Sequence, residues 1–268
     1  MLENYKNHVE ERLEQGIPPL PLNAEQVSEL VELLKSPPSG EEEYILDLIT
    51  NRTPAGVDPA AYVKAAFLTA IAKGETSSPL IDKQHATKLL GTMLGGYNVE
   101  SLIGLLEDTE VGSLAADGLS KTLLMFNAKH DVIELAKKND NARRVVDSWS
   151  NGEWFTSKSK LPEVIKAIVF RVDGEINTDD LSPAPDAPSR PDIPLHALAM
   201  LKKTMEDPIG TIEKLKESGL PVVFVGDVVG TGSSRKSATN SLLWHIGEDI
   251  PFIPNKKQAG ICLSLIHI

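Results

Sequence analysis

The residues best suited to chemistry lie in a glycine-rich segment near the end of the chain. Val222–Val225 is an apolar, β-branched run with the composition of a buried strand. After it come three glycines and a polar run that leads into a helical pattern: Gly226, Gly230, Gly232 and Ser233-Ser234-Arg235-Lys236. A helix start offers free backbone N–H groups and a positive dipole end, and arginine adds a guanidinium fork. The segment therefore predicts a site for a carboxylate or a phosphate.

The spacing of this segment excludes three familiar motifs. A phosphate-binding P-loop needs glycine, four residues and then Gly-Lys-Ser/Thr, and no such run occurs. In a dinucleotide-binding fingerprint, Arg235 would stand where helix–strand packing requires glycine. A nucleophile elbow is also absent. On spacing alone, two interpretations stay equally open: an anion site, or a glycine-rich turn with a serine N-cap and a solvated Arg235–Lys236 pair.

Composition limits the class of protein. With 268 residues, 41% of them apolar, the chain can form about two domains. A formal net charge of −11 argues against a dedicated nucleic-acid binder. We expect no membrane span and no signal peptide, since no apolar run approaches the ~20 residues of a span. The single cysteine, Cys262, fits a reducing, cytoplasmic compartment and excludes an iron–sulfur site within the chain, because such clusters need several thiolates.

The first half of the chain predicts helices only. Residues 24–35 carry an i, i+3, i+4, i+7 apolar stripe behind an N-cap at Asn23, and Pro59 opens another helix behind Asp58. Further helices are predicted at about 3–15, 41–51, 82–92, 99–107, 111–126, 130–138 and 140–151. Short helices joined by short turns indicate a HEAT-like solenoid, with a compact helical bundle as the alternative.

The pattern changes between Asn151 and Pro162, where glycine, serine, threonine and proline interrupt the helices. Beyond this point we predict a strand at 164–172, a proline-stiffened loop at 177–194, and helices at about 195–203 and 209–218. The strand and glycine loop described above follow. We therefore expect a multidomain chain, with an all-α HEAT-like helical domain at 1–155 followed by an α/β domain at 156–268.

Two loops resemble those of a known family. The run Gly230-Thr-Gly-Ser-Ser-Arg-Lys236 is similar to the Gly-x-Gly-Ser-Ser-Arg loop of the swivel domain in the aconitase superfamily. The segment Gly174–Ala199 resembles the bacterial aconitase B branch, in which a HEAT-like domain precedes the swivel domain and the large iron–sulfur domains. The resemblance extends from Met1 to about Leu263 and implies that 156–268 is a swivel domain, incomplete at its C-terminus. Residues 264–268 depart from the family pattern and are assigned no role.

This resemblance implies an activity. The chain would be the N-terminal part of an aconitate hydratase, a lyase of the tricarboxylic acid cycle that interconverts citrate and isocitrate through cis-aconitate. Dehydration of 2-methylisocitrate is left open as a further reaction. The family's 4Fe–4S cluster is ligated by cysteines beyond this chain, so we expect no metal site within it. By itself the chain should therefore be inactive.

The resemblance also implies roles for four residues. By motif match, Ser233 would be the base that removes the substrate proton, while Ser234, Arg235 and Arg190 would hold the tricarboxylate. A serine alkoxide would depend on the N–H groups at the helix start and on Arg235. The residues by themselves leave alternatives open, with Ser233 as a helix N-cap and Arg190 as a surface arginine.

Other polar residues near these loops are given structural roles. Asp179–Asp180 suits N-cap and turn positions, since no histidine or cysteine lies nearby to complete a metal site. His196 and His245 fall in helical segments and are interpreted as packing or surface residues. Cys262 is interpreted as a small buried hydrophobe.

Two functional hypotheses remain. In the first, the partners implied by the resemblance are the tricarboxylate substrate, a second copy bound through the helical domain, and mRNA in the cluster-free form, with no membrane. In the alternative, the chain is a helical protein- or RNA-interaction or regulatory module with an anion-binding α/β appendage. Three cluster-ligating cysteines in the downstream reading frame would favour the enzyme.

Overall fold

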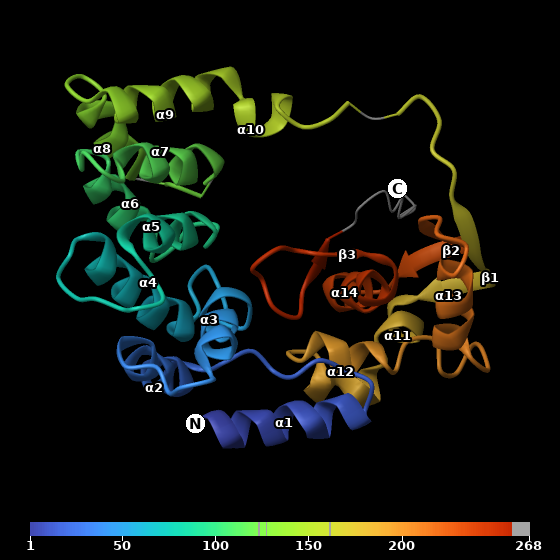
Figure 1. The fold of residues 1–268 in the computed structure, drawn as a ribbon. Coiled ribbons are helices and arrows are strands. Elements are labelled where there is room, and N and C mark those ends of the chain that lie inside the picture. Colours follow the sequence, from blue (N-terminus) through green and yellow to red (C-terminus); the bar gives the residue numbers. More distant parts are fainter. Residues whose placement is uncertain (123, 127, 161, 259–268) are drawn as a thin grey trace. The chain divides into compact units, whose positions relative to one another are not determined.

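The computed structural model of this chain describes residues 1–122, 124–126, 128–160 and 162–258 (Figure 1). Cys262 and the terminal residues 264–268 lie outside these ranges. None of the helices within the described ranges has the length and apolar content that crossing a membrane requires.

The chain divides into two compact units. Among the described residues, one unit holds Pro21–Lys160 with Met1 and Phe252–Pro254, and the other holds Leu2–Leu20 together with residues 162–251 and 255–258. Helix α1, Leu2–Glu14, is thus grouped with the second unit, although the sequence suggests that it belongs to the helical domain. The ranges 1–155 and 156–268 themselves stay a prediction.

In the described residues of the first unit the regular secondary structure is all helical, and this confirms the class expected for it. Its helices are α2 (Ala24–Lys35), α3 (Glu42–Asn51), α4 (Pro59–Ala72), α5 (Lys83–Gly91), α6 (Val99–Leu105), α7 (Gly112–Lys121), α8 (Ala128–Leu135), α9 (Asp140–Asn151) and α10 (Glu153–Thr156). The sequence did not predict α10. The helix predicted over 111–126 ends at Lys121, because Thr122 has an extended backbone with ψ 112°.

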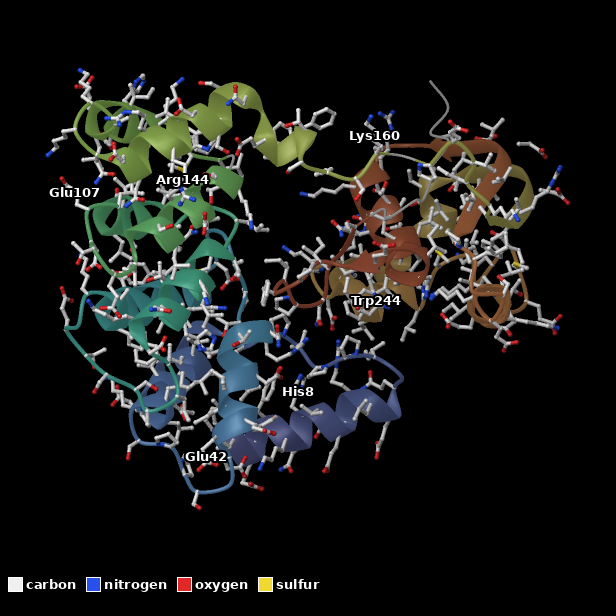
Figure 2. The ribbon with its side chains drawn as sticks, turned by 45° about the horizontal axis from the view of Figure 1, so that its top comes forward. His8, Glu42, Glu107, Arg144, Lys160 and Trp244 are labelled. Atoms are coloured by element: carbon white, nitrogen blue, oxygen red, sulfur yellow. The ribbon has the colours of Figure 1, made fainter. Side chains whose placement is uncertain are left out.

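Successive helices of this unit pack side by side. Helices α2, α4, α5, α7 and α9 each contact the next, as the column of helices in Figure 1 shows. The stripe predicted in α2 is buried, and Asn23 forms a full capping box with Gln26. Between α7 and α9, Nη2 of Arg144 donates to the Ser113 carbonyl at 2.6 Å, and its Nη1 lies 2.8 Å from Oδ1 of Asp117 (Figure 2). This repeated side-by-side packing is the arrangement on which helical solenoids depend.

The second unit has α/β architecture, as predicted. Besides α1 it contains β1 (Ile168–Asn177), α11 (Thr178–Leu181), the 3-10 helix η1 (Ala184–Ser189), α12 (Ile193–Ala197), α13 (Pro208–Lys216), β2 (Val222–Thr231), α14 (Arg235–Ile246), β3 (Glu248–Asp249) and β4 (Lys257–Gln258). Strands β1 and β2 pair in parallel, from Ile168 opposite Val222 to Asn177 opposite Thr231. Strands β3 and β4 form a short antiparallel pair.

Three predicted boundaries in this unit are wrong. Strand β1 begins at Ile168 rather than 164 and continues to Asn177, because its extent follows the partner strand. The predicted loop at 177–194 contains α11 and η1. The helix predicted over 195–203 ends at Ala197; further along, Leu201 has a φ of 58° and its N–H bonds the Asp180 carbonyl at 2.7 Å. A left-handed residue with its N–H committed elsewhere cannot continue a helix.

The core of the second unit lies between the sheet and α14. Buried side chains alternate along β1, and the rings of Phe170 and Phe224 lie 5.9 Å apart. In the first half of β2, Val222 and Phe224 are buried while Val223 and Val225 are half-buried, so one face of the strand start packs into the core. Ala238 and Leu242 of α14 complete the cluster. Packing against one apolar helix face fixes the sheet and therefore the loops at its ends.

Helix α1 is tied to the segment that follows it within the same unit. Tyr5 is buried, and its hydroxyl donates to the Leu20 carbonyl at 2.8 Å. The Leu20 N–H donates to Nε2 of His8 at 3.0 Å, and Figure 2 shows His8 on this helix. Nε of Arg12 donates to the Pro18 carbonyl at 2.9 Å. The return segment after α1 is therefore fixed by side chains of the helix itself.

Candidate functional site

The two loops singled out in the sequence leave the sheet at the same edge. Strands β1 and β2 are parallel and end together, with Asn177 opposite Thr231. The hydroxyl of Thr231 donates to Oε1 of Glu175 at 2.7 Å, which links the two strand ends. After β1 the chain enters α11 and residues 182–192, and after β2 it enters Gly232–Ser234 and α14. The carboxyl edge of a parallel sheet is where α/β proteins place ligand sites.

A one-turn helix anchors both loops. Gly232 has a φ of 107°, and a Cβ built on it would lie 2.4 Å from Oγ1 of Thr178, the first residue of α11. At the other end, the α11 C-cap residue Ser182 accepts a hydrogen bond from Arg190. Since a helix rises 1.5 Å per residue, these anchor points lie about 6 Å apart along the axis. Only glycine fits at position 232, because a side chain there would collide with α11.

The start of α14 is not capped by a serine side chain. Its N-cap residue is Ser234, whose side chain makes no capping hydrogen bond. The Ala238 N–H bonds the Ser234 carbonyl at 3.1 Å, so the N–H groups of the three residues before Ala238 lie at the open end of the helix. Ser233 stands one position before the N-cap, is exposed, and its hydroxyl bonds none of the described residues. The structure therefore gives the N-cap position to Ser234 rather than to Ser233.

Arg235 turns back over the glycine loop. Its Nε donates to the Gly232 carbonyl at 3.2 Å, and its side chain is exposed. The guanidinium, the open N–H groups of α14 and the Ser233 hydroxyl thus belong to one short turn. Positive charge and backbone donors at one place suit an anion.

Arg190 is held on one side and open on the other. Nε donates to Oγ of Ser182 at 3.2 Å, and Nη2 donates to the Ser182 carbonyl at 3.3 Å. The side chain is partly exposed, and its backbone follows the last turn of η1. Nη1 and the second hydrogen of Nη2 form no hydrogen bond with any of the described residues. The end of the guanidinium that carries both Nη atoms is the face that binds a carboxylate in a bidentate way.

A buried histidine supports the loop that carries Arg190. The sequence did not indicate this role. His196 is 3% exposed, as a packing residue would be, but its ring contacts three polar atoms of the Arg190 loop. Nε2 lies 2.7 Å from Oγ of Ser182, and Nδ1 lies 2.8 Å from Oγ of Ser189 and 3.1 Å from the Asp186 carbonyl. Burial lowers the pKa of His196 and favours the neutral ring. The only sequence feature that could have indicated this role is the position of His196, six residues after Arg190.

The N-cap of α11 is Asn177 rather than either aspartate after β1, so the N-cap position predicted for Asp179–Asp180 is wrong, and only the Asp180 side chain takes part in the capping. The Asn177 side chain accepts from the N–H groups of Asp179 and Asp180, while Oδ2 of Asp180 accepts from the Asn177 N–H at 2.8 Å. This capping box starts α11. Across the described ranges, no group of three histidine, cysteine or acidic side chains is placed to hold a metal ion. The one cysteine of the chain lies outside those ranges, so the described residues do not fit an iron–sulfur cluster.

Known proteins align with nearly all of this chain. Residues 4–155 match a family model described as the aconitate B N-terminal domain, and residues 167–266 match one described as the aconitate hydratase 2 N-terminus. Proteins named aconitate hydratase B are 62% identical in Pseudomonas aeruginosa, 58% in Escherichia coli and 52% in Helicobacter pylori. Each alignment covers 98% of this chain but only 31–32% of the relative.

The chain thus spans about a third of the length of the curated relatives it matches. The matched family models describe N-terminal parts, and they correspond to the helical and the α/β regions seen here. The first of these family models matches more than half of the chain. The chain therefore belongs to the aconitase B family, as the resemblance of its two loops indicated.

Proposed function

We propose that this chain is the N-terminal part of an aconitate hydratase, a lyase of the tricarboxylic acid cycle that interconverts citrate and isocitrate through cis-aconitate. Relatives named aconitate hydratase B support this activity. A cytoplasmic location remains the expectation that the single cysteine gives.

The observation that carries the proposed site is the common end of β1 and β2, with Asn177 opposite Thr231. Because the two strands end together, the Arg190 loop and the Ser233 loop leave the sheet at one edge.

In this proposal the chain binds the carboxylates of the substrate. Arg190 offers the end of its guanidinium that carries both Nη atoms, while Ser182 holds the Nε side. Arg235 and the open N–H groups of α14 offer a second positive region beside Ser233 and Ser234. A planar guanidinium binds a carboxylate through two parallel hydrogen bonds, and a lysine ammonium cannot reproduce that geometry.

Ser233 is the proposed base. A serine hydroxyl is a weak acid, so its alkoxide forms only where positive charge and N–H donors stabilise it. The start of α14 supplies both, and the Ser233 hydroxyl bonds none of the described residues and is free to face a substrate. The alkoxide would take the proton from the substrate carbon and return it in the reverse direction.

The 4Fe–4S cluster of this enzyme class would supply a Lewis acid for the substrate hydroxyl. The described residues do not fit such a cluster, so its ligands are proposed to lie in the remainder of the full-length enzyme. The chain of 268 residues is therefore expected to show no hydratase activity by itself. Turnover of citrate by the purified chain would contradict this.

Substitution of Ser233 in the full-length enzyme tests the proposal. Ser233→Ala should lower kcat by roughly 10²–10⁴-fold with little change in KM, because it removes the base and keeps the carboxylate contacts. Arg235→Lys and Arg190→Lys should raise KM, since both lose the fork. Ser218→Ala, an exposed serine on the same unit whose hydroxyl bonds the Leu215 carbonyl, is the control and should turn over normally.

A melting temperature measured on each variant separates catalysis from stability. A Ser233→Ala enzyme that unfolds at a lower temperature but turns over normally would show that the serine only stabilises the turn. The same assay with 2-methylisocitrate tests the second reaction implied by the resemblance.

The alternative function, a helical protein- or RNA-interaction module, gains no support from the described contacts. Association of two copies through the helical domain and binding of mRNA remain expectations of the resemblance. The net charge of −11 gives mRNA no general electrostatic attraction.

A further inference from the structure

Arg190 is held by a serine that is itself held by a buried histidine. Ser182 is fully buried and His196 is 3% exposed. Nε of Arg190 lies 3.2 Å from Oγ of Ser182, which in turn lies 2.7 Å from Nε2 of His196. The hydrogen bonds therefore run without interruption from the partly exposed guanidinium to the interior of the unit.

The contacts on the other side of the ring fix the direction of each hydrogen bond. Nδ1 of His196 faces the Asp186 carbonyl at 3.1 Å, and a carbonyl can only accept, so Nδ1 carries the proton. The Ser189 hydroxyl also donates to that carbonyl, at 2.7 Å, and accepts from Nδ1 at 2.8 Å. Nε2 of the neutral ring is then an acceptor. The Ser182 hydroxyl must donate to it, and this leaves the lone pairs of that oxygen for Nε of Arg190.

A charged ring would break this arrangement. Protonated Nε2 would donate to Ser182, and the serine proton would have to turn away from the ring. A second positive charge would also stand near Arg190 and Lys202, with Asp186 as the facing acid. Burial lowers the pKa of His196, which keeps the ring neutral and the directions intact.

We propose that His196 is a positioning residue for substrate binding, which acts through the Ser182 hydroxyl to fix the Arg190 guanidinium with Nη1 and the second hydrogen of Nη2 open to a carboxylate. This inference rests on the proposed function, in which Arg190 binds the substrate. A free arginine loses side-chain freedom when it binds a carboxylate, and an arginine that is already ordered avoids that loss. The network should therefore improve substrate affinity and leave the chemical step alone.

The test is a set of substitutions in the full-length enzyme, with citrate kcat and KM and the melting temperature measured for each variant. Ser182→Ala and His196→Leu should each raise KM by about five- to tenfold, the worth of about one buried hydrogen bond, with kcat almost unchanged. His196→Gln keeps an acceptor for Ser182 and should recover part of the loss. In an Arg190→Ala background, Ser182→Ala should have no further effect on KM.

His245 provides the matched control. It is a buried histidine of the same unit, 5% exposed, and its Nε2 bonds the Ala197 carbonyl at 2.9 Å rather than the Ser182 hydroxyl. His245→Leu should lower the melting temperature and leave KM for citrate at its normal value. If His196→Leu does not fold, Ser182→Ala decides the question, because it removes only one oxygen.

The outcomes separate this inference from the proposed function. If Arg190→Ala raises KM while Ser182→Ala and His196→Leu leave it unchanged, the positioning role is wrong and the proposed function stands. The same conclusion follows if Ser182→Ala and Arg190→Ala are fully additive, or if His245→Leu raises KM as much as His196→Leu does. If Arg190→Ala itself leaves KM unchanged, Arg190 does not bind the substrate and both proposals fail.

Discussion

Arg12 and Asp192, 180 residues apart in the sequence, form a two-point ion pair inside the second unit. Nη1 of Arg12 lies 2.7 Å from Oδ2 of Asp192, and Nη2 lies 2.9 Å from Oδ1. The two side chains are 7% and 15% exposed, so this pair is largely shielded from water. Asp192 stands two residues after Arg190 and is also the N-cap residue of α12. The pair thus ties α1 to the loop that carries the proposed substrate arginine.

Breaking this pair should destabilise the second unit. Asp192→Ala leaves the buried Arg12 guanidinium without its partner carboxylate and should lower the unfolding free energy by about 3–5 kcal/mol. The measurement is urea unfolding followed by a probe in the second unit, such as the fluorescence of Trp244 (Figure 2). Asp173→Ala, which removes an exposed partner of Arg171 in the same unit, is the control and should change stability little. Equal effects of the two substitutions would show that the Arg12 pair contributes no more than a surface pair.

Lys64 of α4 should destabilise the helical unit below pH 8. It is 2% exposed, its Nζ donates to the Thr50 carbonyl at 3.3 Å, and burial lowers its pKa to about 8. Between pH 8 and 10.5 the unfolded chain binds more protons, so the unfolding free energy rises with pH; below pH 8 the full cost applies. At 1.36 kcal/mol per pH unit, the difference between 10.5 and 8 corresponds to about 3 kcal/mol at most.

Replacement of Lys64 by methionine tests this cost. Lys64→Met should stabilise the helical unit at pH 7 by up to about 3 kcal/mol, and by less at pH 10. Urea unfolding at both pH values gives the comparison. Lys73→Met, at an exposed position just after the same helix, should show no such dependence on pH. A gain that is the same at pH 7 and pH 10 would exclude a buried charge as the cause.

Helices α5 and α7 approach so closely at Gly91 and Gly118 that neither position should accept a side chain. A Cβ on Gly118 would lie 2.9 Å from Cα of Gly91, and the two helix backbones would have to separate. Gly118→Val should therefore cost about 1–3 kcal/mol or more of unfolding free energy. Gly104→Ala is the control, since a Cβ there meets none of the described atoms within 4 Å and the glycine lies in α6. It should gain up to about 1 kcal/mol in the same denaturation experiment, from the higher helix propensity of alanine.

The second unit should lose stability in mild acid through His245. Its Nε2 donates to the Ala197 carbonyl, and burial lowers its pKa below 6.5, with Lys216 and Lys257 acting in the same direction and Glu213 against them. Above pH 6.5 the His245 ring is neutral in both the folded and the unfolded chain. As the pH falls below 6.5 the unfolded chain is protonated first, so the unfolding free energy decreases until the folded state is protonated too.

Substitution of His245 should reduce this acid sensitivity. His245→Gln should show a shallower fall of unfolding free energy below pH 6.5 than the natural chain does. His196, whose pKa burial also lowers, contributes to the slope that remains. His130→Gln, at an exposed position in the helical unit, should leave the slope of the second unit unchanged. An unchanged slope in His245→Gln would show that its protonation is not linked to unfolding.

The sequence by itself determined the features that depend on neighbours along the chain. The stripe and capping box of α2 follow from residues within one helix, and Asp58 with Pro59 marks the start of α4 in the same way. The glycine-rich loop was also predicted, because positive φ values at Gly230 and Gly232 are a local requirement. These features need no distant partner, so periodicity and cap residues were sufficient to predict them.

Only the tertiary structure decided which distant residues meet. The pairing of Asn177 with Thr231 sets the length of β1 and brings two loops to one edge, and it depends on hydrogen bonds between strands more than 50 residues apart. The contact of Arg12 with Asp192 assigns α1 to the second unit, although its helical pattern is the same in either unit. His196 gains its role from Ser182, which it contacts only after α11 and η1 have folded the loop. A sequence pattern records that a residue is apolar or charged, but which partner it finds is fixed by packing of the whole unit.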